Sequence, residues 1–104
     1  MRVKIEITQE DINRGISRNP ETCPVARALK RVCKRGCSMS VGGKDFSITD
    51  NADCVVEVVT SVAVRRFIDK FDNPATRNKC KPFSFTLDML KADAEKLIKP
   101  SCRT

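Results

Sequence analysis

Hydrophobic and polar residues alternate strictly at the beginning of the chain and again near its end. Val3, Ile5 and Ile7 alternate with charged residues, and Phe83, Phe85 and Leu87 recur at every second position. This period of two is that of a β-strand with one face buried. The two segments are therefore predicted to be strands, over residues 2–7 and from Phe83 to Leu87.

A three-stranded meander is predicted in the middle of the chain. Met39/Val41 and Phe46/Ile48 form two alternating runs, and Gly42-Gly43 between them suits a hairpin turn that needs positive φ angles. Residues 50–53 predict a second turn, and the valine-rich segment 54–60 predicts a third strand. Either Val56 and Val58 or Val55 and Val59 would turn inward on that strand.

The segment from Pro24 to residue 35 predicts an amphipathic helix. Pro24 suits the first helical position with Thr22 or Cys23 as cap, and Gly36 is placed to end the helix. At about 100° per residue, one side collects the apolar residues Val25, Ala26, Ala28, Leu29, Val32 and Cys33. The other side collects only cations: Arg27, Lys30, Arg31, Lys34 and Arg35.

Three further helices are marked by capping residues. Thr8 and Asp11 have the spacing of a capping box, in a short helix ended by Gly15. Ser61 is placed to cap a helix that buries Val64, Phe67, Ile68 and Phe71 before Asn73-Pro74. Asp88 is expected to cap a last helix, which carries Leu90, Ala94, Leu97 and Ile98 and is closed by Pro100.

These elements predict one α+β domain over residues 1–104. We expect an antiparallel sheet of four to five strands, with three or four helices packed mainly on one face. The first strand would lie beside the last strand or beside a central one.

The net charge and the absence of histidine favour a binding protein over an enzyme. Lys and Arg number 20 against 13 Asp and Glu, which gives a net charge of +7 and a field that attracts polyanions. The chain has no histidine, the commonest general base, and its carboxylates are spread singly along turns and helix starts. A non-enzymatic binding protein without a cofactor or a metal is therefore predicted.

The predicted partner is a nucleic acid, a nucleoprotein complex or an acidic protein surface. Phosphates would be contacted by the basic helix face and by other clustered cations. The complete set is Arg27, Lys30, Arg31, Lys34, Arg35, Arg65, Arg66, Arg77, Lys79 and Lys81. The chain has neither Trp nor Tyr, and its five Phe occupy apolar-face positions, so stacking on unpaired bases is poorly provided for.

The six cysteines give a second, competing interpretation. Cys33 and Cys37 form one loose pair, which is poor evidence for zinc, and Cys23, Cys33 and Cys54 are expected to act as small core residues. Cys37, Cys80 and Cys102 lie in basic surroundings that would lower a thiol pKa, which keeps a redox-active module open.

The first residues have no apolar stretch of a signal peptide, and no segment reaches transmembrane length. We therefore expect a cytoplasmic protein with reduced thiols and no membrane partner.

The segments Ile7-Thr8-Gln9-Glu10-Asp11-Ile12, Gly15, Cys23-Pro24-Val25-Ala26 and Ala28-Leu29-Lys30 resemble short bacteriophage- and prophage-encoded proteins of unassigned function. The resemblance covers about the first third of the chain and rests on motifs of fold. It implies a phage origin, hence the cytoplasm of a bacterial host, and transfers no functional residues. By analogy it suggests a host-takeover or anti-defence factor that occupies a host complex.

Three alternatives to nucleic-acid binding stay open. The protein would act as a protein-only inhibitor or adaptor on an acidic protein surface, as a cysteine-dependent metal or redox module, or as a homo-oligomer. In the oligomer, the acidic stretch Asp45–Glu57 of one copy would meet the basic helix of the next.

Overall fold

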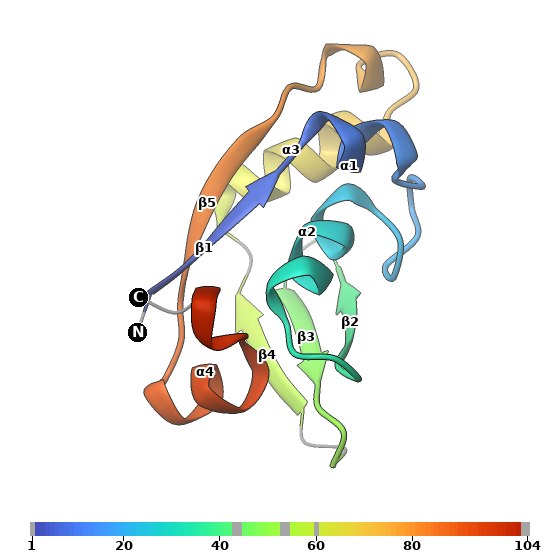
Figure 1. The fold of residues 1–104 in the computed structure, drawn as a ribbon. Helices are drawn as coiled ribbons and strands as arrows, with labels where there is room; N and C mark the ends of the chain where they lie inside the picture. The colour runs from blue at the N-terminus through green and yellow to red at the C-terminus, as the bar shows by residue number, and fades with distance from the viewer. Residues whose placement is uncertain (1, 43–44, 53–54, 60, 103–104) are drawn as a thin grey trace.

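The computed structural model describes residues 2–42, 45–52, 55–59 and 61–102, and within these residues five strands form two antiparallel sheets (Figure 1). β1 (Arg2–Ile7) pairs with β5 (Phe83–Asp88) in one sheet. β2 (Ser38–Val41), β3 (Asp45–Thr49) and β4 (Val55–Val59) form the other, in the order β2-β3-β4. The predicted α+β class is confirmed, and the first strand does lie beside the last. The strands are divided between two sheets instead of being joined in one.

The strand alternation places one face of each sheet in the core. Val3, Ile5 and Ile7 of β1 are at most 2% exposed, and they stand opposite Leu87, Phe85 and Phe83 of β5. On β3, Phe46 and Ile48 are buried in the same way. On β4 the open choice is settled: Val56 and Val58 pack against the core, while Val55 and Val59 are exposed.

Helix α2 (Pro24–Val32) fills the space between the two sheets. It packs against both β1 and β2 (Figure 1). Val25 and Leu29 of α2 are fully buried. Pro24 is the first helical residue, and the Sγ atom of Cys23 accepts the Ala26 amide, so the predicted start is confirmed. α2 is therefore the central element that joins the two halves of the core.

The predicted end of this helix is wrong by three residues. α2 ends at Val32 with Cys33 as its C-cap, because the Lys34 amide donates to the Leu97 carbonyl at 2.7 Å instead of to its own helix. The Lys99 amide donates back to the Val32 carbonyl at 2.9 Å, and Cys33 and Ile98 form an isolated bridge. Lys34 and Arg35 are therefore not part of a helix face.

The other helices follow their capping residues, except the last. α1 (Gln9–Arg14) begins with the predicted Thr8–Asp11 capping box. α3 (Val62–Asp72) begins after Ser61 and has Asn73 as its C-cap, and a 3₁₀ turn, η1 (Arg77–Lys79), follows it.

The prediction that Asp88 caps the last helix is wrong. Asp88 is the final residue of β5, where it pairs with Arg2, and α4 (Lys91–Leu97) begins after Leu90. Leu90 is exposed, whereas Met89 is buried. A 3₁₀ turn, η2 (Pro100–Cys102), ends the described chain.

Both connections of the meander lie where they are predicted, but Gly42 does not have the positive φ angle that the predicted Gly42-Gly43 turn needs. The Gly42 amide donates to the Asp45 carbonyl at 2.8 Å, and the Ala52 amide donates to Asp50 Oδ1 at 2.9 Å. Gly43, Asp53, Cys54 and Thr60 lie outside the described residues. No helix formed by the residues described is both long enough and apolar enough to cross a bilayer.

Replacing Gly36 should destabilise the fold. Gly36 has φ +90°, and a Cβ atom there would clash with the Asn51 amide group, whose Nδ2 donates to the Arg35 carbonyl. Gly36→Ala should lower the free energy of unfolding by about 1–3 kcal/mol, measured by urea denaturation. Gly42→Ala is the matched control, since Gly42 has no left-handed φ and its Cβ would come no closer than 3.1 Å. Equal losses for the two variants would contradict this interpretation.

Candidate polyanion-binding groove

A groove of about 400 Å³ lies between α3, η1 and the beginning of β5. Its walls carry four cationic side chains, Arg66 and Lys70 from α3 and Lys79 and Lys81 from the segment that follows. Its remaining lining is apolar and includes Phe67, Cys80 and Phe83. No acidic residue is among the described residues that line it. The groove therefore combines a positive wall with an apolar floor.

Helical periodicity places two of the cations. Arg66 and Lys70 are four residues apart and share one exposed face of α3, while Phe67 and Phe71 are buried on the inner face. The Thr76 hydroxyl donates to the Lys70 carbonyl at 2.7 Å, which fixes the chain as it leaves the helix. Arg66 and Lys70 therefore lie on the side of α3 that faces η1 across the groove.

Lys79 and Lys81 reach the same groove because Cys80 between them is buried. Cys80 is 7% exposed, and its amide donates to the Arg77 carbonyl at 3.1 Å, which closes the 3₁₀ turn. With Cys80 directed inward, the flanking lysines remain exposed. In the part of the chain that the structure describes, none of the four groove cations is ion-paired.

The apolar floor belongs to an aromatic cluster that joins α3 to β5. The ring centroids of Phe67 and Phe83 are 4.9 Å apart, and those of Phe83 and Phe85 are 5.9 Å apart. Phe67 is buried, whereas Phe83 is only half-buried and reaches the groove.

Arg77 was also predicted as a binding residue, but its side chain is engaged within the fold. Its Nε donates to the Phe71 carbonyl at 3.1 Å, its guanidinium lies 5.0 Å above the Phe71 ring centroid, and Nη2 donates to the Ser17 hydroxyl. It joins η1 to α3 and to the loop after α1.

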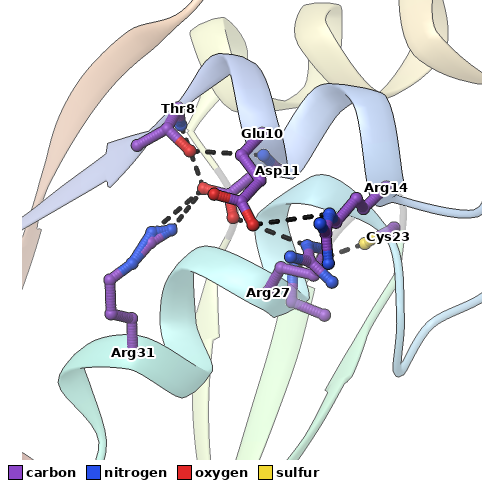
Figure 2. Close-up of polar contacts among 8 residues, drawn as sticks. Thr8, Glu10, Asp11, Arg14, Cys23, Arg27 and Arg31 are labelled. Carbon is purple, nitrogen blue, oxygen red and sulfur yellow. Dashed lines mark hydrogen bonds and ion pairs between the residues drawn. The ribbon is translucent and has the colours of Figure 1, made fainter.

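Two predicted residues on α2, Arg27 and Arg31, converge on one buried carboxylate (Figure 2). The Asp11 side chain is 4% exposed; Arg31 Nη1 donates to its Oδ2 at 3.1 Å, and Arg27 Nε lies 3.5 Å from its Oδ1. Arg31 Nη2 also donates to Oδ2. The same Asp11 completes the capping box: its amide donates to Thr8 Oγ1 at 3.2 Å, and the Thr8 amide donates to Asp11 Oδ2 at 2.9 Å.

An acidic residue therefore does neutralise part of the basic α2 face, although it comes from α1. Burying a carboxylate costs free energy unless the group is ion-paired and hydrogen-bonded. Here Arg27 and Arg31 form ion pairs with Asp11, and Arg31 and the Thr8 amide donate hydrogen bonds to it. Lys30 stays exposed beside a hollow that it shares with Arg27 and Arg31. The Lys34 ammonium donates to the Glu95 carbonyl, which ties it to α4.

The ten residues predicted to bind the partner fall into three groups in the structure. Arg66, Lys79 and Lys81 come together at the groove, while Arg27, Arg31, Lys34 and Arg77 are held by contacts within the chain. Lys30, Arg35 and Arg65 are exposed elsewhere. Lys70, Phe67 and Phe83 were not identified as binding residues from sequence, although the i,i+4 spacing of Arg66 and Lys70 was a signal.

The thiol pKa values of two cysteines differ from the prediction. Burial raises the pKa of Cys80 and of Cys37, and for Cys80 this outweighs the lowering by Lys70 and Arg77. The prediction that basic surroundings lower these two thiol pKa values is therefore wrong. Cys23 and Cys33 are buried core residues, as predicted. Among the residues that the structure describes, no group of three or more Cys, Asp or Glu could hold a metal ion.

Replacing Asp11 should cost far more stability than replacing its neighbour. Asp11→Ala removes the capping acceptor and leaves two guanidinium groups without their partner, so we expect a loss of about 2–4 kcal/mol. Glu10→Ala removes only an exposed pair with Arg14 and should cost at most about 0.5 kcal/mol. Urea denaturation of both variants provides the measurement, and similar losses would show that Asp11 is not a structural anchor.

Cys33 should resist alkylation in the folded protein. Burial, the first cause, together with the nearby Cys37 and Cys102 thiols, raises the pKa of Cys33 to about 12. Because the thiolate is the reactive form, iodoacetamide at pH 8 should modify Cys33 roughly 100-fold or more slowly in the folded than in the urea-unfolded chain. Peptide mass mapping over time follows each site. Equal rates in the two states would contradict a buried thiol.

No family model matches the chain, and no match was found among curated proteins or solved structures. The similarity of the first third to phage-encoded proteins stays a prediction.

Proposed function

We propose that this chain is a non-enzymatic binding protein whose ligand is the phosphate backbone of a nucleic acid, either free or within a nucleoprotein complex. The observation that carries the proposal is the convergence of Arg66, Lys70, Lys79 and Lys81 on one groove with no acidic side chain among its described lining residues. A phosphate chain that enters this groove would meet four cations that form no ion pair with any residue the structure describes.

The rest of the charge distribution supports the groove over the α2 face as the contact surface. Arg27 and Arg31 have the buried carboxylate of Asp11 as their partner, so they would have to give up stabilising contacts to reach a phosphate. The groove cations have no such competing partner among the described residues. The contact surface we propose is therefore different from the basic helix face that the sequence suggested, and shares Arg66, Lys79 and Lys81 with the predicted set.

A binding role without catalysis is supported by the chemistry of the groove. Its titratable groups are cations and the thiol of Cys80, whose pKa is raised by burial, so the thiolate nucleophile is disfavoured at neutral pH. The chain has no histidine to act as a base beside it. In this role the protein would occupy a nucleic acid or a complex that handles it, in agreement with a host-takeover or anti-defence factor.

Binding should depend on salt and on the groove cations. A fluorescently labelled oligonucleotide titrated at 20 to 200 mM NaCl should lose affinity with a log–log slope of about −2 to −4, as expected for three or four phosphate contacts. Lys79→Glu/Lys81→Glu should weaken binding at least about 10-fold. Lys91→Glu/Lys96→Glu makes the same change of net charge on exposed positions of α4, at the other end of the molecule (Figure 1).

The two double variants separate a specific surface from a general attraction. An equal loss in both would show that only net charge matters and would remove the groove from the proposal. Absence of binding by the unaltered protein at 20 mM salt would overturn the proposed function and favour an acidic protein surface as partner.

A further inference from the structure

We infer that the groove takes an unpaired nucleic-acid strand, with one base stacked at Phe83 and the neighbouring phosphates held by the groove cations. This inference rests on the proposed function and names the form of the nucleic acid that the same site recognises. It runs against the expectation from sequence that stacking is poorly provided for, because that expectation assumed that every Phe is used in the core.

Phe83 lies between two hollows on the surface. Phe83 and Pro82 line the basic groove and also line a second hollow of about 380 Å³, bounded by the end of β1 and the beginning of α1. Since both residues line both hollows, they form a ridge between the two. Phe83 is half-buried at this ridge, so part of its side chain can be reached from outside, whereas Phe67 and Phe71 are buried.

The ridge is also held in place. The Phe83 ring is supported by Phe67 from α3 and by Phe85 from its own strand, and Phe83 pairs with Ile7 of β1 in the sheet. Pro82 fixes the backbone φ just before it. A preorganised aromatic platform loses little conformational freedom when a base stacks on it, which favours binding.

The charges on the two sides of the ridge differ, and this orients the strand. The basic groove has four cations, while the second hollow contains Glu6 and no cationic residue among its described lining residues. Phosphates would therefore lie on the α3 side, and the base would be directed toward the ridge. A duplex keeps its bases stacked inside and offers only the backbone, so it would use the cations without the ring.

The experiment compares three polyanions of equal charge on the same protein: an oligothymidine 12-mer, a duplex, and inorganic polyphosphate. Fluorescence anisotropy with a labelled oligothymidine gives its affinity, and unlabelled competitors give the others. We expect the unpaired strand to bind at least 5-fold more tightly than the other two. Equal affinity for all three would overturn the base contact and leave phosphate binding intact, whereas no binding to any would remove the proposed function itself.

Two leucine variants locate the contact. Phe83→Leu keeps an apolar side chain but loses the ring face, and should weaken oligothymidine binding about 5- to 50-fold while leaving the salt slope and duplex affinity unchanged. Phe85→Leu is the matched control: Phe85 is also half-buried on the same face of β5 but lines neither hollow. Circular dichroism and thermal unfolding verify that both variants fold. Equal effects of the two variants on binding would overturn the role of Phe83.

Discussion

The buried carboxylate of Asp11 is the interaction on which the arrangement of this chain depends. It caps α1 through Thr8 and receives Arg27 and Arg31 from α2, so one side chain fixes the start of one helix and the position of the next (Figure 2). A carboxylate that is 4% exposed is stable only with such partners. Because α2 packs on both β1 and β2, fixing α2 also fixes the two sheets relative to each other.

This arrangement has a consequence for function. The arginines that hold Asp11 are the ones that a reading of the α2 sequence assigns to an external partner. Because these arginines are paired inside the fold, the four cations that share the groove between α3, η1 and β5 are better candidates for an external contact. Charge reversal of Arg27 and Arg31 would therefore disturb the fold around Asp11, so it could not test an external contact of α2. The groove cations have no described ion pair and are better suited to such a test.

In the proposed mode of binding, one aromatic cluster would serve both the core and the groove. The aromatic cluster of Phe67, Phe83 and Phe85 joins α3 to β5 and so contributes to the core. At its edge, Phe83 is left half-buried between two hollows. A rigid ring beside four cations is the combination by which proteins bind unpaired strands, since every base has a face that can stack and every nucleotide brings a phosphate.

The sequence by itself determined the local structure of this protein, because period-two and helical patterns and capping residues act over a few positions. The strands at 2–7 and 83–87, the Thr8–Asp11 box, the Pro24 start and the Ser61 cap all follow from neighbours in the chain. Only the tertiary structure decided what depends on distant partners. The Lys34 amide finds Leu97 and ends α2 early, the arginines of α2 find Asp11, and desolvation overrides nearby cations at Cys80. Arg66, Lys70, Lys79 and Lys81 share a groove only because α3 and the following turn fold back on each other.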